Sequence, residues 1–248
     1  MKEKLFKLSA GGAFRLLLFV LILALVACGP RTSSNTGDDQ KTMTTNDKKD
    51  TPVIYVAVGD STGVGVGAGR DGGYPARLLK RIKQERTKAK LVNFCVSGAT
   101  SEDLLRTQLE PAIAASPTLI TVAIGINDMG HYVAVEKFAR NFEEIVRRLK
   151  TETSASIVVS NLPDISFAPV APVSMREQLR AQINLFNKHI TEICKRYDVS
   201  LVDAYTETHA VIPSHPEFFS DDGFHPSDAG YEYWAKSMWP AVKAAIDK

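Results

Sequence analysis

The sequence has few cysteines and almost no excess of charge of either sign. Its three cysteines are Cys28, Cys95 and Cys194, and none of them has the spacing to another cysteine or to histidine that is typical of a zinc site. A formal net charge of +2 is too small to indicate a nucleic-acid partner. No repeat of solenoid length is present in the sequence. We therefore expect neither a zinc protein, nor a nucleic-acid-binding protein, nor a repeat protein.

Two further features are missing. The pattern Gly-x-Ser-x-Gly, which marks the nucleophile turn of α/β-hydrolases, does not occur. The apolar run at residues 16–27 is too short to cross a bilayer comfortably. The remaining composition is ordinary, because 44% of the 248 residues are hydrophobic. That length and composition suit one globular domain with an appendage.

The appendage is the N-terminus, where a basic leader precedes the short apolar run. The run ends in Leu25-Val26-Ala27-Cys28, which resembles a bacterial lipobox. We therefore predict a lipoprotein signal peptide at residues 1–27, removed before Cys28, with lipid attached to that cysteine. Such a protein would be extracytoplasmic and anchored to the bacterial cell membrane. An ordinary secretory signal and an uncleaved anchor are the alternatives.

After Cys28 the sequence becomes rich in Thr, Ser, Asn, Asp and Lys. Such a segment has too few apolar side chains to offset the entropy of folding, so residues 28–51 are predicted to be a disordered tether. Residues 52–248 are predicted to be the catalytic domain. An exported domain can form a disulfide, but Cys95 and Cys194 both fall in apolar contexts and are interpreted as two buried thiols.

Short apolar runs alternate with amphipathic segments through this domain. The runs are continuously apolar, which is typical of parallel strands covered on both faces. We expect a three-layer α/β/α fold with a doubly wound, parallel, five-stranded sheet in the order 2-1-3-4-5. The predicted strands are residues 53–58, 91–96, 119–124, 157–159 and 199–202.

Helical spacing is found between these runs. In the helix predicted at residues 74–86, Leu78 and Ile82 are expected to face inward and Arg77 outward. Ser101 begins a short helix and its hydroxyl is suited to capping it. The remaining predicted helices are residues 135–150, 174–197 and 227–246, the last interrupted or kinked near Pro240.

Polar signatures fall where the predicted strands end. Ser61 follows the first strand, and the turn Asp222-Gly223-Phe224-His225-Pro226 follows the fifth. Because ligands bind beyond the carboxyl ends of parallel strands, these loops are expected to meet at one edge. A serine hydroxyl needs a neighbouring base, and His225 is the histidine with a carboxylate, Asp222, at a suitable local offset. Ser61, His225 and Asp222 are therefore the predicted catalytic residues.

Attack on an ester would build an oxyanion that needs donors aimed at it in advance. Gly98 can bring its backbone N–H close, Asn127 can offer its side-chain amide, and the N–H of Ser61 can supply a third donor. These residues indicate acyl transfer to water without a metal or an organic cofactor. Asp60 and Asp128 are interpreted as organisers of their loops.

The chain resembles the SGNH hydrolases, also called the GDSL esterase/lipase family. The resemblance rests on four blocks in family order: Gly59-Asp60-Ser61, Asn93 to Thr100, Gly125-Ile126-Asn127-Asp128, and Asp222 to Pro226. It covers residues 53 to 230. It implies a flavodoxin-like fold and a serine esterase or lipase that hydrolyses esters or thioesters of lipids, sugars or small acyl groups. Ser61 would be the nucleophile, with Gly98 and Asn127 in the oxyanion hole.

Other readings stay open at this point. A non-catalytic binding lipoprotein could use the same fold, and a nucleotide-binding domain is suggested weakly by Gly67-Ala68-Gly69-Arg70-Asp71-Gly72. The glycine-rich run at residues 63–73 departs from the family pattern, and a wider acyl site or a mobile lid would each explain it. The sequence determines neither the acyl and alcohol parts of the substrate nor the oligomeric state.

Overall fold

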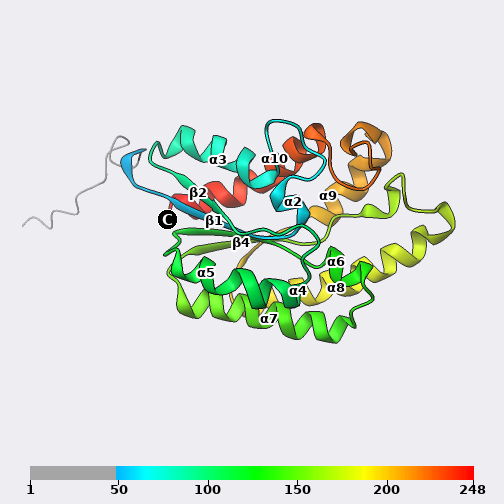
Figure 1. The fold of residues 1–248 in the computed structure, drawn as a ribbon, viewed down its shortest axis with the longest axis horizontal. Coiled ribbons are helices and arrows are strands. Elements are labelled where there is room, and N and C mark those ends of the chain that lie inside the picture. Colours follow the sequence, from blue (N-terminus) through cyan, green and yellow to red (C-terminus); the bar gives the residue numbers. More distant parts are fainter. Residues whose placement is uncertain (1–48) are drawn as a thin grey trace, which may run out of the picture. The chain divides into compact units, whose positions relative to one another are not determined.

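Five parallel strands form the central layer of the protein and pair in the order β2-β1-β3-β4-β5, which confirms the predicted topology. The structure is a computed structural model that describes residues 49–248. Figure 1 shows the sheet between two layers of helices, so the three-layer α/β/α fold is also confirmed. The strands are β1 (Ile54–Gly59), β2 (Lys90–Asn93), β3 (Leu119–Ala123), β4 (Ser156–Ser160) and β5 (Ser200–Val202).

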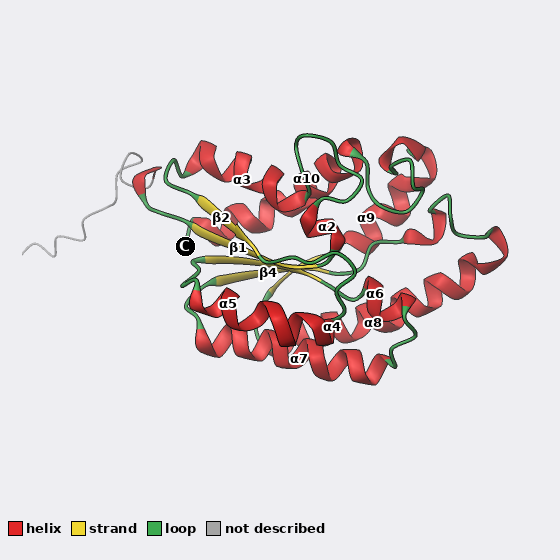
Figure 2. Cartoon of the chain, viewed as in Figure 1, coloured by secondary structure: helices red, strands yellow, loops and turns green. Residues whose placement is uncertain are grey.

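The helices divide between the two faces of the sheet (Figure 2). α3 (Tyr74–Glu85) and α10 (Asp228–Ile246) pack against each other on one face. On the other face lie α5 (Leu109–Ala114), α7 (Val135–Glu152) and α8 (Arg176–Arg196). Shorter helices follow the strand ends: α2 (Ser61–Val64), α4 (Ser101–Asp103), a π-helical segment at Leu104–Gln108, α6 (Ile126–Gly130) and α9 (Ala204–Val211).

The alternation of side chains along β1 explains why its sequence is apolar throughout. Val56 and Val58 point into the core beneath α7 and α8. Tyr55 and Ala57, each the residue directly before one of these valines, join the second core, which packs against α3 and α10. A strand buried on both faces has no polar face, because successive side chains point to opposite sides. Burying these side chains on both faces supplies the main driving force that holds the sheet between its helices.

The structure corrects two expectations about helix starts and faces. Arg77 does not face solvent: only 5% of it is exposed, and it contacts carboxylates of α10. The helical spacing of apolar residues predicts which of them face inward. Whether a charged side chain is buried depends instead on where its oppositely charged partners lie. The hydroxyl of Ser101 does not cap α4. Thr100 does so, accepting a hydrogen bond from the N–H of Asp103, while Ser101 bonds to Asp128.

Several boundaries also differ from the prediction. β2 ends at Asn93, so Cys95 lies in the loop beyond the strand and is half-buried, whereas Cys194 is buried in α8. Both of these thiols are free. α10 is not interrupted at Pro240. α9 was not expected from the sequence, since its hydrophobic residues follow no clear helical stripe.

The predicted signal peptide and Cys28 lie outside the described residues, as does the predicted tether except for residues 49–51. Within residues 49–248, no helix combines the length and the apolar character that crossing a bilayer requires. The lipid anchor therefore stays a prediction.

Candidate active site

Ser61 lies at the carboxyl end of β1, where it is the first residue of α2 and only 4% exposed. Asp60 caps this short helix: its carboxylate accepts hydrogen bonds from the backbone N–H of Thr62 at 2.9 Å and from its hydroxyl at 2.8 Å. Asp60 thus has the loop-organising place that was expected. Burial raises the pKa of Asp60 above its usual value, although the bonds from Thr62 oppose this shift.

Gly59 fixes the point at which the chain leaves the sheet. It is in register with Ala123 of β3, and a Cβ atom at this position would lie 2.3 Å from the Ala123 carbonyl oxygen. The buried amide of Gln108 bonds to both backbone groups of Gly59, at 2.9 Å from the N–H and 2.8 Å to the carbonyl oxygen. Gln108 therefore helps to position the turn before Ser61. No motif pointed to it, because it lies far from Gly59 in the sequence.

The turn after β5 holds His225 against Ser61. The Nε2 atom of His225 is 3.0 Å from the Ser61 hydroxyl oxygen, across 164 residues of sequence. Its Nδ1 atom is 2.5 Å from the Asp222 carboxylate. Asp222 also accepts hydrogen bonds from the backbone N–H groups of Phe224 and His225, both at 2.8 Å. The structure thus brings together the three residues that the sequence singled out for nucleophile, base and orienting carboxylate.

The electrostatics of this turn keep Asp222 ionised. Partial burial raises its pKa, but the hydrogen bonds from the His225 ring and from two backbone N–H groups outweigh burial, and the pKa lies well below its usual value of 3.8. The edge-on ring of Phe224, 5.0 Å from the imidazole, packs against His225 from the side. A charged carboxylate on Nδ1 fixes the imidazole in the tautomer whose Nε2 faces the Ser61 hydroxyl.

Gly98 and Asn127 follow the neighbouring strands. Gly98 has a φ of +78°, a left-handed conformation, and the space around a Cβ atom there is open. The backbone angle therefore favours glycine here, whereas no described side chain or backbone atom crowds the position. The expected approach of its N–H to an oxyanion stays a prediction. The side-chain amide of Asn127 donates a hydrogen bond to the carbonyl oxygen of Ala99 at 3.0 Å, which ties the loop of Gly98 to α6.

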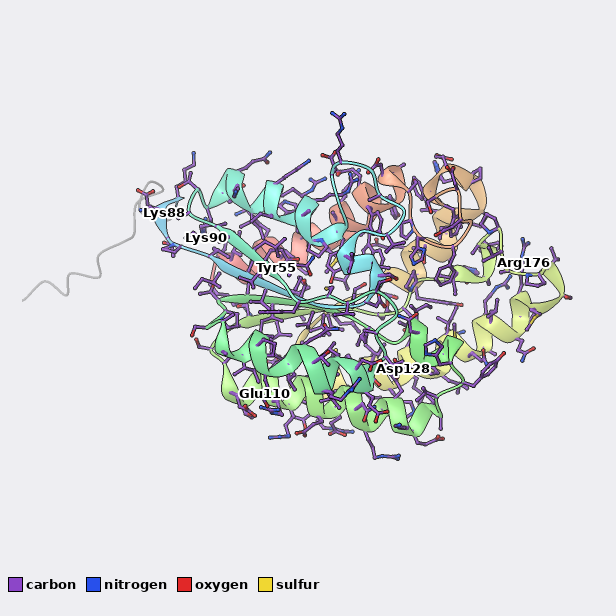
Figure 3. The ribbon with its side chains drawn as sticks, in the orientation of Figure 1. Tyr55, Lys88, Lys90, Glu110, Asp128 and Arg176 are labelled. Atoms are coloured by element: carbon purple, nitrogen blue, oxygen red, sulfur yellow. The ribbon has the colours of Figure 1, made fainter. Side chains whose placement is uncertain are left out.

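Asp128 supports the same loop from within the protein. Figure 3 shows Asp128 beside the loops at one end of the sheet, and Lys88 and Lys90 at the opposite end. It is fully buried and accepts hydrogen bonds from the N–H of Ser101 at 2.8 Å and from its hydroxyl at 2.5 Å. Burial raises the pKa of Asp128 above its usual value, although the bonds from Ser101 oppose the shift. Asp128 is thus a loop organiser, as expected.

An apolar cavity opens beside Ser61 and His225. Its lining comes mainly from the ends of β3 and β4, from α9 and α10, and from a cluster of phenylalanines before His225. The apolar and aromatic lining side chains include Ile124, Leu162, Ile212, Phe218, Phe219, Phe224 and Trp234. Gly98 and Asn127 do not line this cavity. Ser61 and His225 are thus the predicted site residues that line this cavity together.

Two other histidines also have carboxylate partners, one close in sequence and one distant. His215 bonds through Nδ1 to Glu217 at 2.7 Å on the surface. His209 bonds to the buried Asp164 at 2.7 Å and stacks on Tyr205. Neither is hydrogen-bonded to a serine hydroxyl in the described part of the chain. Within residues 49–248, no group of three or more His, Cys, Asp or Glu side chains is arranged to hold a metal ion.

Comparison with curated proteins finds relatives of low identity. The chain is 24% identical over 250 residues to the uncharacterized protein YpmR of Bacillus subtilis, covering 90% of this chain and 93% of that protein. It is 23% identical over 193 residues to the esterase TesA of Pseudomonas aeruginosa, covering 77% of this chain and 88% of that protein. The spore germination lipase LipC of Bacillus licheniformis is 25% identical over 207 residues, covering 74% and 93%.

Solved structures share the fold. A crystal structure of TesA superposes with a TM-score of 0.63 at 22% identity, covering 77% of this chain and 99% of that one. An acetyl xylan esterase from Geobacillus stearothermophilus gives a TM-score of 0.63 at 20% identity, covering 80% and 96%. The model of the GDSL-like Lipase/Acylhydrolase family matches residues 57–233, which include every strand end described above. The chain therefore belongs to the GDSL-like lipase/acylhydrolase family, whose members are serine hydrolases acting on esters.

Proposed function

We propose that the protein hydrolyses carboxylic esters with Ser61 as nucleophile, His225 as general base and Asp222 as the carboxylate that orients it. The observation that carries the proposal is the unbroken chain of contacts from Asp222 through His225 to the Ser61 hydroxyl, at 2.5 and 3.0 Å. These distances are within the range at which a base can take a proton from a nucleophile. Ser61 and His225 both line the apolar cavity, which gives an ester a place to bind beside them.

The reaction has two halves. In the first, the Ser61 oxygen attacks the ester carbonyl while His225 takes the hydroxyl proton, and the same imidazolium then gives that proton to the departing alcohol. In the second, His225 takes a proton from water, the hydroxide attacks the acyl-serine, and the carboxylic acid leaves as Ser61 regains its proton. Asp222, held ionised by its hydrogen bonds, stabilises the imidazolium in both halves.

The oxyanion of each tetrahedral intermediate needs preorganised donors. We assign the backbone N–H groups of Ser61 and Gly98 and the side-chain amide of Asn127 to this task. An asparagine amide has two donor hydrogens, and Asn127 uses one to bond to the Ala99 carbonyl oxygen. That bond supports the assignment, because it fixes the direction in which the second N–H points.

The substrate is assigned an apolar chain, because the cavity beside Ser61 is lined by aliphatic and aromatic side chains. An apolar chain in such a cavity contributes roughly 0.8 kcal/mol for each methylene group that leaves water. Among the relatives, TesA is an esterase and LipC a spore germination lipase, which agrees with an acyl ester substrate. The acetyl xylan esterase shows that the same fold also serves a carbohydrate ester.

We also propose that the enzyme works outside the cytoplasm, held to the cell membrane by lipid on Cys28. The support is the sequence Leu25-Val26-Ala27-Cys28 directly after a short apolar run. Two or more acyl chains on one cysteine give stable membrane attachment, whereas a single chain does not. The esters of lipids and of cell-wall sugars are both within reach at such a surface.

The test is a panel of p-nitrophenyl esters of increasing acyl length, hydrolysed by the parent protein beside Ser61→Ala. We expect turnover that depends on Ser61, together with labelling of Ser61 by a serine-directed phosphonate. Turnover that survives in Ser61→Ala, or phosphonate bound to another serine, would contradict the assignment. A parent protein that binds esters without cleaving them would favour the alternative of a non-catalytic binding lipoprotein.

A further inference from the structure

The glycine-rich loop at residues 65–73 lies directly against the turn that carries His225. A Cβ atom on Gly67, whose φ is +84°, would lie 2.7 Å from the carbonyl oxygen of Pro226 and 2.7 Å from the Ser220 hydroxyl. The same loop continues from α2, since Gly65 ends that helix with its N–H bonded to the Ser61 carbonyl oxygen at 2.9 Å. The loop therefore contacts both halves of the candidate site.

Arg77 of α3 holds this loop through a buried side chain. Its side chain is only 5% exposed. The guanidinium donates a hydrogen bond to the Gly72 carbonyl oxygen at 3.1 Å and forms an ion pair with Asp228. A second carboxylate, Glu232, lies 3.4 Å away. A guanidinium this buried needs partners that replace its lost water, and its planar fork can join several acceptors at fixed angles.

Asp228 completes the connection from the side of α10. Its two carboxylate oxygens each lie 3.2 Å from the backbone nitrogen of Gly69, whose N–H they accept. Asp228 therefore contacts both the loop and Arg77. The hydroxyl of Tyr231, one turn later, donates to the Val66 carbonyl oxygen at 2.7 Å. Asp228 follows His225 by three residues, across Pro226 and the helix-capping Ser227. Two anchors on α10 thus hold the loop next to the His225 turn.

We propose that Arg77, Asp228 and Tyr231 are positioning residues that hold His225 at bonding distance from Ser61, with the glycine-rich loop as a fixed brace between the two. The inference rests on the proposed function, because it gives these residues a role in the reaction. The loop is then neither a lid nor an extension of the acyl site. Its glycines are required where the backbone has positive φ and where Pro226 and Asp228 approach it closely.

The physical reason is the sensitivity of proton transfer to geometry. A displacement of about 1 Å in a reacting group can lower the rate by about 10²-fold. Ser61 begins α2 directly after β1, whereas His225 lies in the turn before α10, far away in sequence. The ion pair of the buried Arg77 with the more exposed Asp228 connects the two segments. It restricts their relative movement without placing another group in the reaction path.

The experiment compares Asp228→Asn, Arg77→Met and the double variant, with p-nitrophenyl acetate as substrate. Arg81→Met is the matched control, because Arg81 joins α3 to Glu232 of α10 without touching the loop. We expect each positioning variant to lose about 10- to 100-fold in kcat with little change in KM, as expected for misplaced reacting groups. The control should keep the parent kcat.

The double variant separates positioning from stability. Asp228→Asn leaves the Arg77 charge short of a partner and should lower the urea unfolding midpoint, which removing Arg77 as well should partly restore. We expect kcat to stay low in that double variant. Recovery of both kcat and the midpoint would mean that the pair acts only through stability, and unchanged kcat in the single variants would also overturn the inference.

Tyr231→Phe is a second variant that tests the same inference if a charge variant does not fold. It removes only the hydroxyl that bonds to Val66, and we expect a several-fold loss of kcat; a parent-like kcat in this variant would overturn the inference. Ser61→Ala is measured beside all of them. If the parent shows no turnover that depends on Ser61, the proposed function fails and this inference with it. If the parent is active and the variants equal it, only the inference fails.

Discussion

Asn127 combines an observed structural contact with a proposed role in the chemistry. Its amide bonds to the Ala99 carbonyl oxygen at 3.0 Å, and Ala99 directly follows Gly98. Two of the three proposed oxyanion donors are therefore connected through this hydrogen bond. Donors that are held in place in advance need no reorientation when negative charge develops, which is why we propose that the bond serves the reaction.

Replacing Asn127 with alanine should lower kcat for an activated ester by about 10²- to 10³-fold, as loss of one oxyanion donor does. The measurement is steady-state turnover by protein whose folding has been checked by circular dichroism. Asn141→Ala is the control, because Asn141 bonds to Ser101 in the same region without belonging to the candidate site. A folded Asn127→Ala variant with parent-like kcat would remove Asn127 from the mechanism.

Asp222 links the site to the pH dependence of stability. Its pKa in the folded protein is below the usual value of 3.8, so the ionised form is favoured by folding. A carboxyl group of this kind stabilises the fold at pH above its unfolded pKa, and the contribution is lost as the pH falls through the folded pKa.

We therefore expect Asp222→Asn to be less stable than the parent near neutral pH and the difference to shrink as the pH falls below 3.8. Urea unfolding of both proteins across acid pH measures the difference in unfolding free energy. A difference that stays constant down to strongly acid pH would show that the Asp222 charge does not contribute.

At the scale of elements, α9 forms part of the lining of the candidate site, although its sequence did not predict a helix. This helix contributes Ala204, Glu207 and Thr208 to the cavity beside Ser61. The weak pattern is understandable, because one side of the helix faces this cavity and other residues, among them His209, pack on a separate polar and aromatic cluster. A helix with partners on two sides needs no single apolar stripe.

Ala204→Leu should fill part of the cavity and select for shorter esters. Ala204 is 3% exposed and lines the cavity, so added carbons occupy space that a longer chain would need. We expect kcat/KM for long-chain p-nitrophenyl esters to fall by about 10-fold or more relative to acetate, because pocket contacts of one or two methylenes discriminate at this level. Ala210→Leu, on the exposed side of α9, is the matched control. An unchanged chain-length profile would place the apolar chain elsewhere.

At the scale of the whole molecule, the described part of the chain has two hydrophobic cores, one on each face of the sheet. The described residues of both cores run from Val53 onward. Cys28 is not among the residues assigned to the candidate site, so its substitution changes none of them. The proposed anchor can therefore be tested on the intact protein.

Cys28→Ser should shift the protein from the membrane fraction to the soluble fraction of expressing cells, while turnover per molecule stays at the parent level. The reason is that a serine at this position does not accept the thioether-linked lipid. Mass spectrometry of the mature parent protein should find residue 28 at its N-terminus and modified. An unmodified Cys28, or a variant that remains in the membrane fraction, would contradict the proposed anchor.

The presence of five buried parallel strands, and the residues proposed for the chemistry, could be predicted from the sequence itself. Apolar runs ending in glycine or polar residues mark buried parallel strands, since these signals are local and repeat along the chain. The turn from Asp222 to His225 is local as well: one carboxylate bonds to the ring and to the backbone three residues later. Its geometry therefore follows from five consecutive residues.

Only the tertiary structure decided which distant groups meet. The 3.0 Å contact between His225 and Ser61 spans 164 residues, and the contacts of Gln108 with Gly59 and of Arg77 with Asp228 are equally remote from any local pattern. Arg77 looked like a surface residue because its partners lie on α10 and in a loop. Packing sets such pairings, and the free energy of packing depends on every element that surrounds the pair, whereas a local pattern reports only the chain near it.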